Sequence, residues 1–281
     1  MFDAVAFAGG GNRCYWQGGF YEAVADRLGF PPKLTAGVSA GAFACIYSVL
    51  GIGPRVRELV LAACGPHRKN FDFSAWRAGD PLCPVGPMYR ALLDEILDQA
   101  ALQELQRRTD LHIALARLPF GMPPLFGAAL GIAAYQIEKH LLHPVHPRFG
   151  RALGFRAEFI RVRDLTIASD LRDAVIASGS VPPFMPRVLV GGKPGFDGGL
   201  ADNVPVGPLE PIEAAGGRTL VLLTRTYQRV PKVPGRTYIQ PSRPIGAKQF
   251  DITDPAAIRA AYELGLEDGK AFARSEQAHA H

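Results

Sequence analysis

A serine lies in the pentapeptide GVSAG, Gly37–Gly41, which has the G-x-S-x-G pattern. The residues before it read as a short strand and those after it as a helix. A serine on such a sharp turn has a strained backbone and an exposed hydroxyl, and the helix N-terminus stabilises negative charge beside it. Outside this context the pentapeptide is often a chance match in a chain rich in Gly, Ala and Ser. Here Ser39 is a candidate nucleophile, with Gly37 and Gly41 shaping the turn.

A nucleophilic serine needs a base, and the histidines of this chain are poorly placed to supply one. In the α/β-hydrolase triad the residues follow one another along the chain in the order serine, acid, histidine. Only His279 and His281 follow Asp197, the best acidic candidate, and both lie in the terminal tail EQAHAH. Three others are spaced by three, but Pro144 and Pro147 break the helix that would align them on a metal. We therefore predict neither a histidine-dependent triad nor a metal site. The seven histidines are His67, His112, His140, His143, His146, His279 and His281.

An aspartate that acts directly on the serine is the alternative base. The segment FDGGLADNVP, Phe196–Pro205, carries Asp197 followed by Gly198 and Gly199. Because glycines remove side-chain obstruction, a carboxylate in this loop can approach another backbone closely. An isolated Asp-Gly pair is more often a plain turn, and Asp202 is a rival acid in the same segment.

A glycine-rich loop lies near the start of the chain, in FAGGGNRCYWQGG, Phe7–Gly19. Gly9, Gly10 and Gly11 expose backbone amides that no side chain screens, as the oxyanion of an acyl-transfer reaction requires. A dinucleotide loop would need glycine at position 14, where Cys14 stands, and a phosphate-binding P-loop would need Gly-Lys-Ser/Thr. The loop is therefore predicted to bind an oxyanion.

Taken together, these motifs resemble those of the patatin-like phospholipase family. The likeness rests on GGGNR, on GVSAGA, on ASGSVPPFMP at Ala177–Pro186 and on DGGLADNVP, in the family's order along most of the chain. It implies a lipid acyl hydrolase of three-layer α/β/α fold with a central, mainly parallel sheet.

The resemblance also implies roles for particular residues, with no metal or organic cofactor in the chemistry. Ser39 would be the nucleophile, Asp197 would accept its proton, and the amides of Gly9–Gly11, in a loop shaped by Arg13, would form the oxyanion hole. The family usually has glycine where this chain has Cys14, which puts the local backbone path in question.

Alternating strand and helix patterns place these motifs on a predicted parallel sheet covered by helices. Asp170 is predicted to cap the helix Leu171–Ser178, and Gly179 to end it in a left-handed conformation. ASGSVPPFMP, at this helix end, is either a wall of the active-site cleft that positions the Asp197 hairpin or a plain exit from the helix. The predicted strands are Ala4–Ala8, Lys33–Val38, Leu111–Leu118, Glu158–Val162 and Leu220–Thr224, with a hairpin from Val188 to Phe196. The predicted helices are Tyr15–Leu28, Ala40–Leu50, Pro54–Ala63, Pro87–Leu97, Leu125–Ile137, Leu171–Ser178 and one running from Pro255 towards Arg274.

The length of 281 residues allows one large α/β domain or two small ones, and the family resemblance implies a single domain over residues 1–281. Hydrophobic residues make up 48% and charged residues 20%, which is ordinary for a folded protein. The net charge of +5 suits weak attraction to anionic surfaces but does not indicate nucleic acid, since no nucleic-acid motif accompanies it. Four cysteines without a C-x-x-C pair, and no export signal at the N-terminus, favour the cytoplasm.

One segment, residues 118–137, carries no acidic or basic residue. Three prolines interrupt it, so it is too broken to span a membrane. It is either a buried helix with its loop or a lid that meets lipid at the membrane surface, within an insertion at 118–147. The arginines that follow suit anionic headgroups or a solvated face equally well; they are Arg148, Arg151, Arg156, Arg161 and Arg163.

The predicted function is hydrolysis of lipid carboxylic esters, of phospholipase A or lysophospholipase type. Three alternatives stay open: an acyltransferase on the same site, a catalytically weak lipid-binding protein that retains the fold, and nucleotide binding at the glycine loop. Headgroup, acyl-chain and positional preference and the oligomeric state are not predicted.

Overall fold

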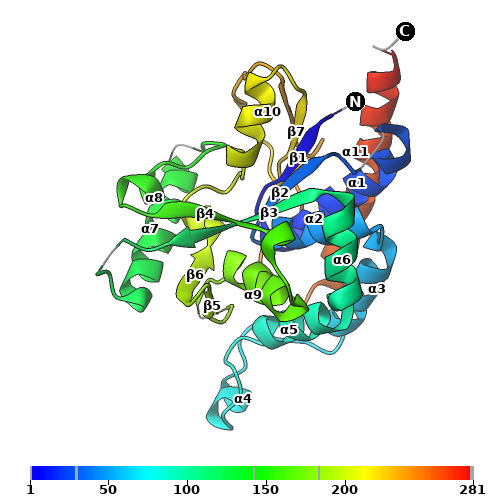
Figure 1. Ribbon diagram of the computed structural model, residues 1–281. Coiled ribbons are helices and arrows are strands. Elements are labelled where there is room, and N and C mark those ends of the chain that lie inside the picture. Colours follow the sequence, from blue (N-terminus) through cyan, green and yellow to red (C-terminus); the bar gives the residue numbers. More distant parts are fainter. Residues whose placement is uncertain (1, 29–30, 120, 142, 183, 279–281) are drawn as a thin grey trace.

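A mixed, mostly parallel sheet forms the centre of the protein (Figure 1). The computed structural model describes residues 2–28, 31–119, 121–141, 143–182 and 184–278. Its eight strands run in the order β5-β6-β3-β2-β1-β7-β8, and β4 also pairs with β3. The strands are β1 (Ala4–Phe7), β2 (Leu34–Val38), β3 (Asp110–Arg117), β4 (Arg156–Arg161), β5 (Val188–Val190), β6 (Lys193–Asp197), β7 (Thr219–Leu222) and β8 (Arg236–Ile239).

Strand register brings distant motifs to one edge of the sheet. β1 and β2 run parallel with Phe7 opposite Gly37, so the glycine loop and the GVSAG turn leave the sheet side by side. β2 runs parallel to β3 with Val38 opposite Ala114, and β6 joins β3 in antiparallel pairing with Leu115 opposite Asp197. This register carries the end of β6 to the end of β2.

Helices cover the sheet because alternate strand residues face opposite sides. Val5 and Phe7 belong to the large core under α1, α2 and α11, whereas Ala4 and Ala6 face a smaller cluster under Val204 and its neighbours. The predicted three-layer α/β/α fold is therefore confirmed. The helices are α1 (Tyr15–Leu28), α2 (Ala40–Leu50), α3 (Gly53–Cys64), α4 (Phe73–Arg77), α5 (Val85–Ile96), α6 (Gln99–Arg108), α7 (Pro124–Leu141), α8 (Phe149–Ala152), α9 (Ala168–Ser178), α10 (Glu210–Ala214) and α11 (Pro255–Ala278).

Two details of the predicted helix before Gly179 are wrong. α9 begins at Ala168, whose amide donates to Gln99 Oε1 at 3.0 Å, so Asp170 lies inside the first turn and is not its cap. Gly179 has φ of −110°, outside the left-handed region. The sequence patterns also missed α4, α6, α8, α10 and β8.

Across the described ranges, no helix combines the length and the apolar character needed to cross a bilayer. α7 covers the predicted helix Leu125–Ile137 and extends beyond it at both ends. Gly131 of α7 lies against the side chains of Phe155 and Leu200, so this part of the helix packs on the body of the protein.

Candidate active site

The GVSAG turn joins β2 to α2 and holds Ser39 in a strained conformation. Ser39 has φ of 55° and ψ of −137°, and a positive φ at a non-glycine residue costs of order 1–3 kcal/mol. Neither flanking glycine leaves room for a side chain: a Cβ on Gly37 would lie 2.5 Å from Ala42 Cα, and one on Gly41 would lie 2.6 Å from the Phe7 carbonyl. The surrounding backbone therefore fixes the serine at the N-terminus of α2.

Ser39 and Asp197, 158 residues apart in the chain, are joined by a hydrogen bond. Ser39 Oγ donates to Asp197 Oδ2 at 2.7 Å, and the other carboxylate oxygen accepts from the Gly199 amide at 2.7 Å. The Asp197 amide donates to the Ser180 carbonyl at 3.0 Å, so the segment after α9 does position this aspartate. Gly198 lets the loop after β6 pass close to the end of β2, since a Cβ on this residue would lie 2.5 Å from Val38 Cγ2.

Burial sets the proton affinity of the Asp197 carboxyl, because this residue is only 9% exposed to solvent. Removal from water raises the pKa of the carboxyl to about 6, against the opposing effect of hydrogen bonds from Ser39 and Gly199. The carboxyl therefore remains mostly ionised at neutral pH, yet it is a stronger base than an ordinary aspartate.

The glycine loop lies beside Ser39, with two of its three glycine amides unused. The Gly9 amide donates to the Asn203 carbonyl at 3.0 Å, so Gly9 fixes the loop and does not offer its N–H. The amides of Gly10 and Gly11 donate to no acceptor among the described residues, and both glycines line a cavity with Ser39. Arg13 Nε donates to the Gly10 carbonyl at 3.3 Å, as expected of a residue that shapes the loop.

Cys14 occupies the position where the family resemblance predicts glycine, and its side chain packs inside the protein. Its Sγ donates to the Ala8 carbonyl at 3.5 Å. Burial raises the pKa of the thiol well above its usual range, so the side chain stays neutral. The backbone passes through a short 3-10 turn, Gly11–Cys14, directly into α1.

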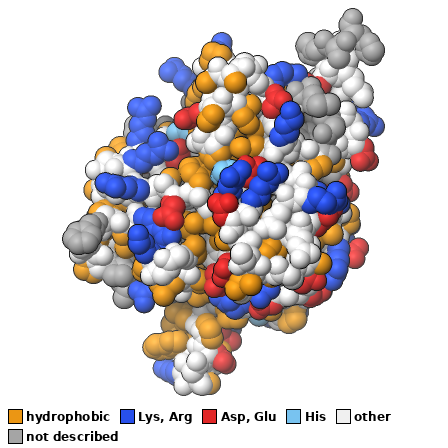
Figure 2. Space-filling model, in the orientation of Figure 1, with side chains coloured by type: hydrophobic (Ala, Val, Ile, Leu, Met, Phe, Trp, Pro, Cys, Tyr) orange, Lys and Arg blue, Asp and Glu red, His pale blue; other side chains and the backbone are white. Residues whose placement is uncertain are grey.

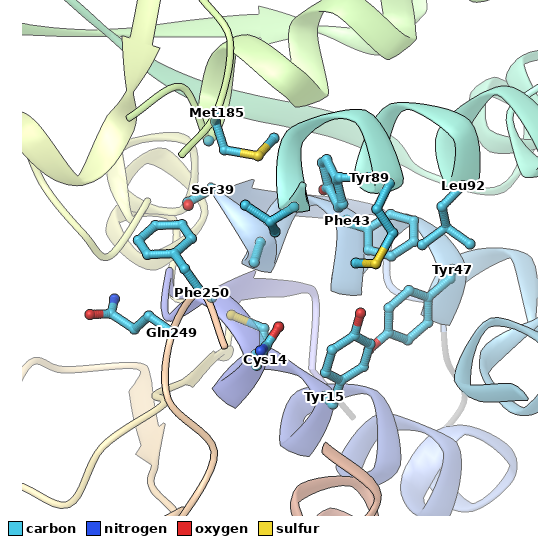
Figure 3. Close-up of a pocket in the computed structure, with 16 residues that line it drawn as sticks. Cys14, Tyr15, Ser39, Phe43, Tyr47, Tyr89, Leu92, Met185, Gln249 and Phe250 are labelled. Atoms are coloured by element: carbon cyan, nitrogen blue, oxygen red, sulfur yellow. The ribbon is translucent and has the colours of Figure 1, made fainter. Parts of the chain in front are cut away.

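Two cavities meet at Ser39. The first is mostly apolar, with Ser39 at one end and Leu92 and Tyr47 at the other (Figure 3). Its wall includes Phe43, Met88, Tyr89, Met185 and Phe250. The second is lined by both catalytic candidates, Ser39 and Asp197, and by the glycine loop. Its other lining residues include Gly199, Asn203 and Gln136.

Three further residues support the site and were given no role by the sequence. Ser178 Oγ accepts from the Ser39 amide at 2.7 Å and donates to the Ala114 carbonyl at 2.6 Å. Asn203 Nδ2 and Thr224 Oγ1 both donate to the Gly9 carbonyl, at 2.9 and 2.7 Å. Ser178 lies in the motif ASGSVPPFMP and Asn203 in DGGLADNVP, so these two motifs were the sequence features that could have indicated both residues.

The rival acid Asp202 belongs to a different network. Its carboxylate pairs with Arg151, lies 3.1 Å from His146 Nδ1, and accepts from the Val204 amide at 3.0 Å. His279 and His281 fall outside the described residues. Within the described ranges, no group of three His, Cys, Asp or Glu residues is arranged to hold a metal ion.

A protein-family model matches most of the chain. The family model described as "Patatin-like phospholipase" matches residues 5–210, which include the glycine loop, Ser39 and Asp197. No curated protein matches the chain.

Proposed function

Because the chain belongs to the patatin-like phospholipase family, we propose that it hydrolyses lipid carboxylic esters through a Ser39–Asp197 dyad. The family supports a hydrolase that acts on lipid esters in general. The observation that carries the finer proposal is the 2.7 Å hydrogen bond from Ser39 Oγ to a buried carboxylate, next to the unused amides of Gly10 and Gly11.

The reaction proceeds through an acyl-enzyme. Asp197 takes the Ser39 proton as Oγ bonds to the ester carbonyl carbon, and the carbonyl oxygen becomes an oxyanion that accepts from the Gly10 and Gly11 amides. Collapse breaks the bond to the alcohol, which leaves with the proton from Asp197. Water then attacks the acyl-enzyme with Asp197 as base, releasing the fatty acid and returning the proton to Ser39.

The two cavities support a division of the substrate at Ser39. The acyl chain occupies the apolar cavity between Phe43, Met88 and Leu92, and the alcohol part lies on the side of Gln136 and Asn203. This arrangement suits phospholipase A or lysophospholipase activity. An alcohol in the second cavity could also replace water, so product analysis should include an acceptor such as glycerol.

We also propose one domain over residues 1–281, in which 118–147 is an insertion that walls the second cavity. Ile132 and Gln136 of α7 line that cavity, and the buried Glu138 carboxylate accepts from the backbone amides of Arg148 and Phe149. Positions 120 and 142 of the insertion fall outside the described residues. Strands β7 and β8, which follow residue 210, belong to the same sheet.

For location we propose the cytoplasm, with contact at a membrane surface. All four cysteines are buried free thiols, consistent with a reducing compartment.

A lipid-panel assay tests the function. Purified protein should release fatty acid from phospholipid or lysophospholipid, Ser39→Ala should abolish release, and Ser48→Ala should retain it. Ser48 is the matched control because its buried hydroxyl has no hydrogen-bond partner among the described residues. Equal release by wild type and Ser39→Ala would refute the proposal.

A further inference from the structure

An exposed aromatic surface lies far from the sheet, on residues 66–84, which we call the aromatic arm. Phe71, Phe73 and Trp76 are 41%, 62% and 57% exposed within six residues of sequence. Figure 1 shows α4 projecting from the body, and Figure 2 shows apolar side chains gathered on that projection. Large apolar side chains grouped in this way usually mark a surface that contacts a partner or a membrane.

The arm has a defined shape and a fixed base. The Asp72 amide donates to the Leu82 carbonyl at 2.9 Å, closing the arm at its neck, and the Asp72 carboxylate accepts from the first amides of α4. At the base, Asn70 Nδ2 donates to Asp251 Oδ1 and Asn70 Oδ1 accepts from the Ile252 amide, both at 3.0 Å. These hydrogen bonds fix the backbone of the arm, which therefore holds the aromatic side chains in their exposed positions.

A row of aromatic rings joins the arm to the candidate active site. The Phe71 ring lies 5.4 Å from the Phe184 ring, edge to face, and Phe184 stacks on Phe250 at 4.9 Å between centroids. Phe250 lines both cavities at Ser39 (Figure 3). The arm is thus joined by apolar ring contacts to the wall of the cavities at Ser39.

Basic side chains flank the aromatic ones. The arm carries three exposed cations, Arg68, Lys69 and Arg77, and two carboxylates, Asp72 and Asp80. None of these cations lies within ion-pair distance of a carboxylate among the described residues, although hydrogen bonds from the first amides of α4 and, to a smaller extent, the charge of Lys69 lower the pKa of Asp72. Of the five arginines that follow α7, Arg151 pairs with Asp202, and Arg161 and Arg163 pair with Asp110. Arg148 and Arg156 are exposed and form no ion pair with a carboxylate of the described residues. Exposed aromatic rings with exposed cations beside them suit the headgroup region of an anionic bilayer.

We propose that the aromatic arm docks the protein on anionic phospholipid surfaces, with Phe71, Phe73 and Trp76 entering the headgroup region beside the entrance to the apolar cavity. This inference rests on the proposed function, because docking at the arm delivers lipid esters to Ser39. The occupant is a lipid surface, since the arm combines exposed aromatic rings and exposed cations with ring contacts that reach Phe250 in the cavity wall.

Vesicle binding tests the arm directly. Wild type should bind phosphatidylcholine vesicles that contain phosphatidylglycerol, and the Phe71→Ser/Phe73→Ser/Trp76→Ser variant should bind at least about tenfold more weakly. The matched control is Phe126→Ser/Ile137→Ser, which removes exposed apolar side chains from α7 and should bind as wild type. Arg68→Glu/Lys69→Glu/Arg77→Glu should lose the preference for phosphatidylglycerol.

Trp76 provides a direct signal, because the other tryptophan, Trp16, is fully buried. Brominated phospholipid should quench wild-type fluorescence on binding and leave Trp76→Phe unquenched. No quenching of bound wild type, or binding lost in the α7 control and kept in the arm variant, would overturn the proposal.

Hydrolysis of a short, soluble ester separates this proposal from the proposed function. The arm variant should hydrolyse it at the wild-type rate while losing activity on vesicles. Arm-dependent vesicle binding by a protein without any esterase activity would sustain the docking and refute the function. Esterase activity without vesicle binding would refute the docking alone.

Discussion

Replacing Asp197 with asparagine should destroy activity and stabilise the fold. The native carboxyl is buried and its pKa is raised to about 6, from an ordinary value of 3.8. Folding at neutral pH therefore transfers a charged carboxylate into a site that favours its neutral form. Asparagine carries no charge, and it can accept from the Gly199 amide while its own amide group donates to Ser39 Oγ, so both native hydrogen-bond contacts are retained.

The sign and size of the stability gain follow from linkage. Between about pH 4 and 6 the native state of wild type binds more protons than the unfolded state, so its stability falls as pH rises through this window. A difference of about two pKa units, at about 1.4 kcal/mol each, makes the full gain of Asp197→Asn about 3 kcal/mol at pH 8. At pH 4 the gain should shrink to below about 1 kcal/mol, because the carboxyl is then largely neutral.

Denaturant unfolding of wild type and Asp197→Asn from pH 4 to 8 measures this gain, alongside ester hydrolysis, which should fall by about 10²–10⁴-fold. Asp202→Asn is the matched control: its carboxylate pairs with Arg151 and His146, so this variant should be less stable than wild type. A stability difference for Asp197→Asn that is negative at pH 8, or that does not change with pH, would refute the reasoning.

Three further predictions concern the same site. Because the base must be ionised, kcat/KM for a neutral ester should be lost as pH falls through about 6; an acid limb near 4 would contradict the burial of Asp197. Gly41→Ala should destabilise the fold by about 1–3 kcal/mol or more in thermal unfolding, since its Cβ would meet the carbonyls of Phe7 and Ala8; an unchanged Tm would be contrary evidence. Ser178→Ala should cost about 1–3 kcal/mol and lower kcat, because the buried Ser39 amide loses its acceptor, whereas wild-type kinetics would show that this bond does not matter.

Much of the site could be predicted because its parts are local. The strand before Ser39, the helix after it and the glycines around it are encoded by neighbouring residues, and so are the exposed amides of the glycine loop. The choice between Asp197 and Asp202 could not be made from residues alone. It depends on the pairing of β6 with β3, which places Leu115 opposite Asp197 and carries this carboxylate to the end of β2.

What the sequence missed depends on contacts between distant segments. Ser178 becomes a support for Ser39 only when the end of α9 packs against β3, and α9 begins early because Gln99 accepts from Ala168. The aromatic arm escaped prediction for another reason. Phe71, Phe73 and Trp76 do not follow a core-facing period, and only their exposure in the folded chain distinguishes them from buried aromatic residues.

Labelling with a fluorophosphonate, followed by peptide mapping, is the decisive test of the Ser39–Asp197 dyad. Wild type should carry one adduct, on Ser39, and Ser39→Ala should carry none, while labelling of folded Asp197→Asn should be slowed by about 10²-fold or more. An adduct on another residue, or labelling of Asp197→Asn at the wild-type rate, would contradict the Ser39–Asp197 dyad.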